Sequence, residues 1–228
     1  MSKHLLMFDV DGTLVQSLDL EDKLFPLSCE QALGIDSVSS DWSQYEVPSD
    51  RGIVSQLAET RLNRPATQED FDKAEASFHR LIREELERFP DACRALPGAV
   101  EMIETVKALP DTIVAIATAG WRSTAHLKLS QAGFDVEGII LCSSSERRTK
   151  AEIMELATQR ARSRFGIENF KSQTYVGDSP GDKQASERLG FQFIGIRSKE
   201  NTNQQEEYPF SCYTDLDHFL ATLKTKRK

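Results

Sequence analysis

Cysteine and histidine are scarce in this sequence, and neither type is clustered. Among the 228 residues there are four cysteines and four histidines. The cysteines are widely spaced and form no Cys-x-x-Cys pair: Cys29, Cys93, Cys142 and Cys212. The histidines are equally isolated: His4, His79, His126 and His218. These patterns argue against a disulfide framework, a zinc site or a histidine-based metal centre, and they predict reduced thiols in or near the core.

Long apolar runs and an excess of positive charge are also lacking. No run of about eighteen apolar residues occurs, and Met1 to His4 lead into a predicted strand rather than into a signal peptide. The formal net charge of -8 argues against general nucleic-acid binding, which needs a basic surface. We therefore expect a cytoplasmic protein with no nucleic-acid or membrane partner. Residues 198–207 are expected to form a polar loop, and residues 224–228 a basic tail.

The segment from Leu5 to Thr13 carries the first functional signal. Four apolar residues, Leu5 to Phe8, predict a short strand that is buried on both faces and ends where Asp9 begins. Asp9 would lie at the carboxyl edge of a parallel sheet, where ligands bind, and Asp11 returns to the same side. Two carboxylates about 4 Å apart repel by roughly 4 kcal/mol at an effective dielectric near 20, so the pair must share a proton or hold a cation. Asp9 could then be a nucleophile and Asp11 a proton donor and acceptor; a simple strand-to-turn junction is the alternative.

Helical and strand-like patterns divide the chain into two parts. Residues 17–92 show only helical patterns, one of which follows a capping signal at Thr67 to Asp70. From residue 96 onward, short apolar strands near 113–117, 139–142, 174–176 and 191–196 alternate with helices. This alternation predicts an α/β fold with a Rossmann-like parallel sheet, covered by helices on both faces and formed by residues 1–16 and 93–228. Residues 17–92 would form an inserted all-α cap domain, able to rock over a site.

Two later strand ends carry polar groups. Thr118 precedes Ala119 and Gly120, so its hydroxyl and the nearby N–H groups could bind phosphate oxygens, although a threonine at a strand end is ordinary. Asp178 also ends a strand, and Asp182 follows at the start of the next helix. Carboxylates so placed can bind Mg²⁺ directly or through its waters. The alternative is that they only cap a turn and a helix.

A basic residue is expected near these carboxylates. Four carboxylates and a phosphate dianion exceed the charge that one divalent cation neutralises, so an ammonium or guanidinium group would stabilise the site. Lys150 and Arg148 are both candidates, because the register through Arg147 to Lys150 is ambiguous. A solvated basic turn is the remaining interpretation.

Together these signals resemble the four motifs of the haloacid dehalogenase superfamily. The segment Asp9 to Thr13 is similar to its first motif, Asp-x-Asp-x-Thr. Thr118, a basic residue at 150 or 148, and Gly177 to Asp182 stand in the order of the other three. The helical insertion after the first motif is similar to that of members with an α-helical cap, such as phosphoglycolate phosphatase and β-phosphoglucomutase. Two features depart from the pattern: many relatives have Asn or Ser where Ala119 stands, and the usual Gly-Lys-Pro around the basic residue is absent.

The resemblance implies a Mg²⁺-dependent phosphatase that hydrolyses a small phosphate monoester through an aspartyl-phosphate intermediate. Asp9 would be the nucleophile, and Asp11 the general acid and base. Mg²⁺ would be held by Asp9, the backbone carbonyl of Asp11 and Asp178, with Asp182 supporting it from behind. A phosphomutase of the β-phosphoglucomutase type, or a non-catalytic phosphate-binding or interaction protein that keeps the fold, are the alternatives.

The resemblance also suggests which residues bind the substrate, a small phosphorylated metabolite. Thr118, with Ala119 and Gly120, would hold the phosphate together with Lys150 or Arg148. In the insertion, Pro48 to Arg51 occupy a place similar to the family's specificity loop, so Ser49 and Arg51 could contact the rest of the substrate. An exposed arginine with no special role is the alternative for Arg51.

Overall fold

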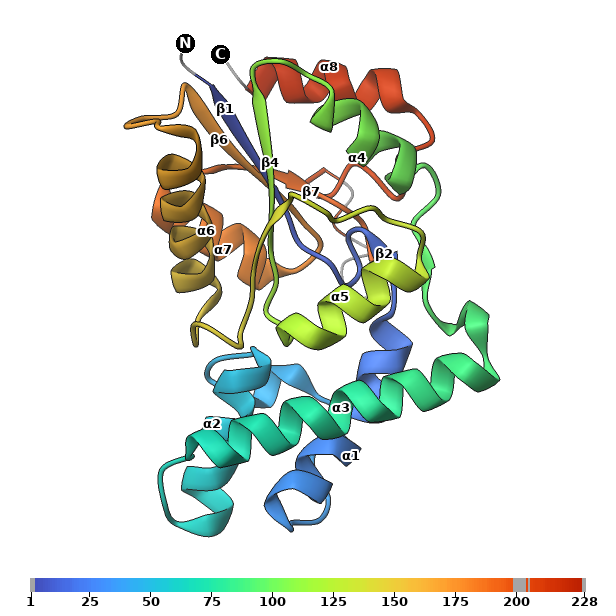
Figure 1. Ribbon diagram of the computed structural model, residues 1–228, viewed down its shortest axis with the longest axis vertical. Coiled ribbons are helices and arrows are strands. Elements are labelled where there is room, and N and C mark those ends of the chain that lie inside the picture. Colours follow the sequence, from blue (N-terminus) through green and yellow to red (C-terminus); the bar gives the residue numbers. More distant parts are fainter. Residues whose placement is uncertain (1–2, 199–203, 205, 227–228) are drawn as a thin grey trace.

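The computed structural model describes residues 3–198, 204 and 206–226, and its centre is a five-stranded parallel sheet. The strands lie in the order β5-β4-β1-β6-β7, so β1 is the middle strand (Figure 1). Their bounds are β1 His4–Phe8, β4 Thr112–Ala117, β5 Ile140–Cys142, β6 Ser172–Gly177 and β7 Gln192–Gly195. The predicted α/β class with a Rossmann-like parallel sheet is confirmed.

Strand β1 is buried on both faces, as its uninterrupted apolar sequence predicts. Leu6 and Phe8 belong to one hydrophobic cluster, and Leu5 and Met7 belong to another. Successive side chains of a strand point to opposite faces, so the four residues join both clusters to the sheet. Because β1 is also flanked by β4 and β6, its carboxyl end is held from both sides.

Helices cover both faces of the sheet (Figure 1). Helices α6 (Lys150–Phe165) and α7 (Pro180–Leu189) pack on the face of Leu5 and Met7. The opposite face is covered by three helices: α4 (Ala99–Lys107), α5 (Arg122–Gln131) and α8 (Leu216–Lys226). The observed ends differ from the predicted ones by one or two residues. Strand β6, for example, begins at Ser172, because two polar residues precede its apolar run.

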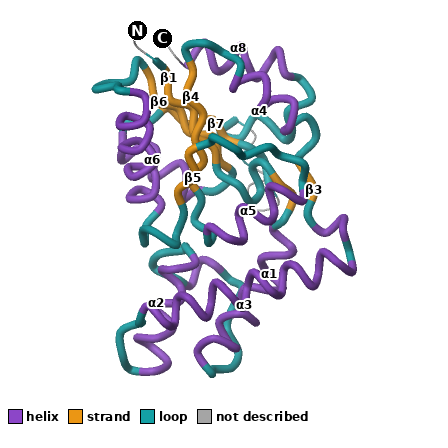
Figure 2. Tube along the Cα trace, in the orientation of Figure 1, coloured by secondary structure: helices purple, strands orange, loops and turns teal. Residues whose placement is uncertain are grey.

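A helical insertion separates β1 from the other strands of the sheet along the sequence. We define it as α1 (Leu18–Leu33), α2 (Asp50–Leu62) and α3 (Gln68–Arg88). It lies at one end of the molecule, beyond the carboxyl ends of the strands (Figure 2). Short 3₁₀ segments, η1 (Trp42–Gln44) and η2 (Pro90–Ala92), complete it. The apolar stripe that the sequence predicts on α3 is buried at Ala74, Phe78, Ile82 and Leu86 and partly buried at Phe71 and Leu81.

The two crossings between the sheet and the helical insertion are paired with each other. Strand β2 (Val15–Gln16) and strand β3 (Arg94–Ala95) form an antiparallel two-stranded ribbon. The N–H of Leu96 also donates to the carbonyl of Leu14 at 2.9 Å. The sequence analysis did not predict this ribbon, because two residues are too few to show a strand pattern.

Other expectations concern cysteines, membrane segments and the chain ends. All four cysteines are free thiols, and Cys29, Cys93 and Cys142 are buried. Within the described part of the chain, no helix combines the length and apolarity that a membrane span requires. The predicted loop at 198–207 and basic tail at 224–228 lie partly outside the described residues. Met1 and Ser2 lie entirely outside them.

Candidate active site

Three aspartates meet at the carboxyl edge of the sheet. Asp9 directly follows β1, Asp178 directly follows β6, and Asp182 lies in the first turn of α7. Each offers a carboxylate oxygen, and these oxygens all lie within 4.8 Å of one another. All three residues are buried. The Asp9 N–H donates to the carbonyl of Val176 at 2.9 Å, which ties the ends of β1 and β6 together.

Asp182 is held in place by its own helix terminus. It forms a capping box with Ser179, in which each side chain accepts a hydrogen bond from the other's backbone. Its Oδ2 also accepts from the N–H of Asp178 at 3.2 Å, while Oδ1 forms an ion pair with Lys150 at 2.9 Å. A Cβ atom at Gly177 would lie 2.5 Å from Oδ2 of Asp182, so only glycine allows this approach. Both oxygens of Asp182 are thus engaged within the protein.

The turn after β1 is pressed against Asp178. Gly12 has a φ of +71°, and a Cβ atom there would lie 2.2 Å from Oδ2 of Asp178. The hydroxyl of Thr13 donates to Oδ1 of Asp178 at 3.4 Å. Glycine is required on two grounds: its left-handed backbone and the contact with the carboxylate.

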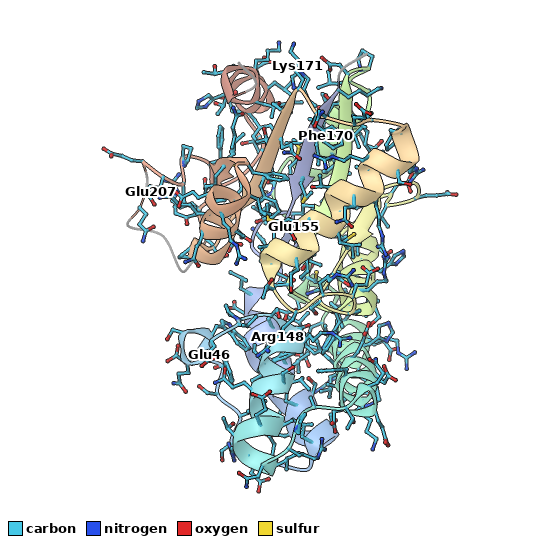
Figure 3. All side chains as sticks on the ribbon, turned by 90° about the vertical axis from the view of Figure 1, so that its left-hand side faces the viewer. Glu46, Arg148, Glu155, Phe170, Lys171 and Glu207 are labelled. Carbon is cyan, nitrogen blue, oxygen red and sulfur yellow. The ribbon has the colours of Figure 1, made fainter. Side chains whose placement is uncertain are left out.

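Lys150 is the basic residue that reaches the carboxylates. It is the first residue of α6, and its Nζ lies 2.8 Å from Oδ1 of Asp9 and 3.3 Å from the carbonyl of Ala117. Arg148 is exposed; it lies at the boundary between the helical insertion and the rest of the molecule (Figure 3), and its backbone carbonyl accepts a hydrogen bond from the Ser49 hydroxyl. Of the two predicted basic residues, the structure brings Lys150 to Asp9.

The loop after β4 lies beside this group. Thr118 is buried, and its hydroxyl oxygen accepts from the N–H of Gly120 at 3.1 Å, which leaves its O–H free to turn toward a ligand. The carbonyl of Ala119 accepts from the N–H of Asp50 at 3.0 Å. The predicted phosphate loop is therefore already in contact with the helical insertion.

Ser49 and Arg51 join the helical insertion to the sheet side. Arg51 donates from Nε to the carbonyl of Ser144 at 2.8 Å and from Nη2 to that of Ser145 at 2.9 Å. Its guanidinium lies 4.1 Å from the centre of the Phe71 ring. These contacts place both residues at the junction of the two parts, where the sequence analysis expected substrate contacts.

Asp11 does not join the three aspartates with its side chain. Its Oδ1 accepts from the Ser17 hydroxyl and, at 2.6 Å, from Nζ of Lys128. Lys128 Nζ also lies 2.5 Å from Oε1 of Glu21, and the Lys128 side chain is fully buried. Nearby, Oδ2 of Asp50 accepts from the N–H of Trp121 at 2.7 Å.

The sequence from residue 6 to residue 196 matches the family model of the haloacid dehalogenase-like hydrolases. This chain belongs to that family. No curated protein matches it. The resemblance to the superfamily's motifs is thereby confirmed at the level of the family.

Solved structures share the fold of this hydrolase. A predicted phosphoglycolate phosphatase from Haemophilus somnus is 20% identical, with a TM-score of 0.59 and coverage of 95% of this chain and 97% of that one. An archaeal beta-phosphoglucomutase from a Pyrococcus species is 20% identical, with a TM-score of 0.55 and coverage of 97% and 99%. CbbY from Rhodobacter sphaeroides, solved with phosphate, is 19% identical, with a TM-score of 0.62 and coverage of 87% of each chain.

The charges of the hydrolase make this edge of the sheet favourable for a cation. Burial raises the pKa of Asp9 to about 7, although Lys150 opposes the shift and Asp182 adds to it. Burial disfavours the charged form of Lys150, but the carboxylates of Asp182 and Asp9 outweigh that effect and hold the Lys150 pKa above its ordinary value. The three carboxylates and one ammonium leave a formal charge of -2 when all are ionised. A divalent cation would balance that charge and favour the ionised form of Asp9.

The group around Lys128 was missed by the sequence analysis. Burial raises the pKa of Glu21 to about 7, and it also raises that of Asp50 well above its ordinary value. Burial disfavours the charged form of Lys128, but Asp11 and Glu21 outweigh it and keep the Lys128 pKa above its usual range. One signal could have found Lys128: it follows buried Ala125 by three residues, which puts it on the apolar stripe of α5.

Proposed function

We propose that this hydrolase is a Mg²⁺-dependent phosphatase that hydrolyses a small-molecule phosphate monoester through an aspartyl-phosphate intermediate. The observation that carries the proposal is the placement of Asp9, whose carboxylate ends the central strand beside both Asp178 and Lys150. A nucleophile needs this combination, because a cation and an ammonium together offset the charge of an incoming phosphate.

Asp9 and Asp178 would hold the magnesium ion, with the backbone carbonyl of Asp11 as a third oxygen ligand. All-oxygen donors suit this ion. The close approach of Gly12 to Asp178 fixes the Asp178 carboxylate. Both oxygens of Asp182 are already engaged, so Asp182 would support the metal site indirectly, through the Asp178 N–H and Lys150. When bound, Mg²⁺ would neutralise charge on the transferring phosphoryl group.

The chain's own residues would carry out two half-reactions. In the first, a carboxylate oxygen of Asp9 bonds to phosphorus, while the bond from phosphorus to the leaving oxygen breaks and Asp11 gives that oxygen its proton. In the second, Asp11 takes a proton from water as the water oxygen bonds to phosphorus and Asp9 is released. Lys150 and the Thr118 loop, with Ala119 and Gly120, would bind the phosphoryl oxygens.

The helical insertion would serve as the cap over this site, with residues 17–92 as its span. Its contacts to the phosphate loop and to the strand ends support the proposal, since they hold the insertion over the carboxyl edge of the sheet. These contacts join Asp50 to Ala119 and Trp121, and Arg51 to Ser144 and Ser145. Exclusion of water by such a cap favours phosphoryl transfer to Asp9 over side reactions. Ser49 and Arg51 would then border the bound substrate.

Hydrolysis of p-nitrophenyl phosphate, with and without MgCl₂, tests the proposal. We expect turnover only with the metal, and the Asp9→Asn variant should be inactive while retaining its circular dichroism spectrum. Glu155→Gln, on the exposed side of α6, is the matched control and should match the unaltered protein. An inactive purified protein would favour a non-catalytic phosphate-binding role, and activity in Asp9→Asn would refute the nucleophile.

Incubation with a hexose 1-phosphate separates a phosphatase from a phosphomutase. Both would use Asp9 and Asp11, so the site residues alone do not distinguish them. We expect release of inorganic phosphate. Formation of an isomeric hexose phosphate without phosphate release would instead indicate a mutase.

A further inference from the structure

Lys128 is a fully buried cation that the proposed mechanism does not yet use. It lies on α5, between the buried residues Ala125 and Leu129. A buried ammonium is strongly unfavourable unless it is paired, and Lys128 is paired twice, with Asp11 and with Glu21. An apolar residue would fill this place on the stripe without any such requirement. The Lys128 ammonium is therefore best explained by the two carboxylates that it binds.

One of the two partners is the proposed general acid and base, and Lys128 holds only one of its oxygens. Oδ1 of Asp11 accepts from both Lys128 and the hydroxyl of Ser17. The other oxygen, Oδ2, faces the phosphate loop, since a Cβ atom at Gly120 would lie 3.6 Å from it. Two donors on Oδ1 fix the rotation of the carboxylate, so Oδ2 is the oxygen presented to the leaving group.

The other partner lies across the junction. Glu21 belongs to α1 in the helical insertion, whereas Lys128 belongs to α5 against the sheet. The hydroxyl of Ser17 comes from the crossing just before α1. Both anchors of Oδ1 therefore depend on where the start of α1 lies: Ser17 directly, and Lys128 through its bond to Glu21.

We propose that Lys128 is a positioning residue that holds Oδ1 of Asp11, so that Oδ2 carries the transferred proton, and that Glu21 makes this orientation depend on docking of the helical insertion. The inference rests on the proposed phosphatase function. In the first half-reaction, the O–H bond at Oδ2 breaks as the leaving oxygen gains the proton and the electron pair of the broken P–O bond. In the second, Oδ2 regains a proton from water as water displaces Asp9 from phosphorus.

Leaving-group dependence tests the role of Lys128, with p-nitrophenyl phosphate and phenyl phosphate as probes. Phenolate is the more basic leaving group, so it depends more on a placed proton donor. Lys128→Met should lower kcat on phenyl phosphate about 10²-fold, with KM changed much less, because a positioned acid or base contributes roughly 10² to 10⁴-fold. On p-nitrophenyl phosphate the variant should release a burst of about one nitrophenolate per enzyme and then turn over slowly, since only hydrolysis of the aspartyl phosphate still needs the base.

A double variant tests whether the effect of Lys128→Met is due to misfolding. Lys128→Met leaves Glu21 buried without its cation, whereas Lys128→Met/Glu21→Leu replaces both by apolar side chains, which proteins often tolerate without loss of stability. The double variant should show the same burst on p-nitrophenyl phosphate and the same loss of kcat on phenyl phosphate. Lys107→Met, which removes a more exposed ion pair on α4, is the matched control and should show neither.

The outcomes separate the two proposals. If the unaltered protein hydrolyses neither probe, the phosphatase proposal fails, and this inference fails with it. If the unaltered protein is active and both variants lose activity equally on the two probes, without a burst, Lys128 is structural and the inference alone is wrong. Unchanged kinetics in folded variants would overturn it equally.

Discussion

At the scale of single residues, Gly12 links backbone conformation to the geometry of the site. Its φ of +71° is in the left-handed region, and a Cβ atom would lie 2.2 Å from Oδ2 of Asp178. We predict that Gly12→Ala displaces the Asp178 carboxylate and lowers kcat about 10²-fold or more, because a misplacement of about 1 Å can have that effect. The strain itself costs roughly 1–2 kcal/mol of stability.

Gly34 supplies the control for that prediction. It has a similar φ of +66° at the end of α1, but a Cβ atom there would meet nothing within 4 Å. Gly34→Ala should therefore lose a similar amount of stability in urea unfolding and keep its turnover of p-nitrophenyl phosphate. Equal activity of the two variants would contradict the importance of the Gly12–Asp178 contact.

Lys150 and Arg148 also differ in whether they contact a carboxylate of the site. Lys150 lies against Asp9, whereas the Arg148 side chain is exposed. We predict that Lys150→Met lowers kcat roughly 10²- to 10³-fold, as the loss of one preorganised donor to a developing charge typically does, while Arg148→Met stays close to the unaltered protein. Steady-state kinetics with p-nitrophenyl phosphate measure both. The reverse order would make Arg148 the cationic residue that neutralises the phosphate.

The placement of much of the candidate site could be predicted because strand ends are visible in the sequence. Asp9, Thr118 and Asp178 each end an apolar run, and the parallel sheet brings such ends to one edge. For Lys128, the sequence shows its place on the apolar stripe of α5 but not its ion-pair partners. A lysine on an apolar stripe usually extends its ammonium to solvent, and only the tertiary fold shows that two carboxylates meet it instead.

At the scale of elements, the start of α3 shows how one carboxylate can stabilise a helix. Asp70 forms a capping box with Thr67, and Arg64 donates to both of its oxygens, at 2.6 and 2.9 Å. The hydrogen bonds from Arg64 hold the Asp70 pKa well below its usual range; burial opposes this shift, and the hydrogen bonds from Thr67 add to it. The ionised form of Asp70 is therefore the one that the fold favours.

Asp70→Asn should lower the free energy of unfolding by about 1–2 kcal/mol at pH 7, in line with the loss of a cap and a charge-assisted pair. The pKa is lower in the folded state, so the contribution is present above the unfolded value of about 4 and is lost as the pH falls toward the folded value. The difference between the two proteins in urea unfolding should shrink below about pH 4. Asp72→Asn, an exposed position on the same helix, is the control; a difference that does not change with pH would contradict the assignment.

Helices and the longer strands could be predicted because their signals are local. Capping residues and apolar periodicity mark α3 and α6, and uninterrupted apolar runs mark β1 and β4. The β2–β3 ribbon could not, since each strand has two residues and its partner lies far along the chain. Only the folding of the insertion between them brings the two segments together.

At the scale of the whole molecule, the proposed magnesium site should couple to stability. The buried carboxylates of Asp9, Asp178 and Asp182 repel one another, and a cation that binds only the folded state adds its binding free energy. At a concentration about 100 times its dissociation constant, Mg²⁺ should stabilise the protein by about 2.7 kcal/mol and raise the Tm by roughly 5–10 °C.

Thermal unfolding with MgCl₂ and with EDTA measures this effect. Asp178→Asn should abolish the shift, whereas Glu155→Gln, far from the three aspartates on the exposed side of α6, should retain it. A shift of the same size in Asp178→Asn would place the ion elsewhere. No shift in the unaltered protein would argue against a magnesium site in the resting enzyme.

The β2–β3 ribbon also joins the two parts of the molecule at a single place. Val15 pairs with Ala95 and Gln16 pairs with Arg94, so the outgoing and returning chains pass through one narrow place. Two separate tethers would let the helices slide or twist in several directions. Here sliding one chain past the other would cost the hydrogen bonds of the ribbon, whereas bending at the ribbon would not. We therefore expect bending at this one place to be the easiest displacement of the helices, and the arrangement seen here is the one that pairs Glu21 with Lys128.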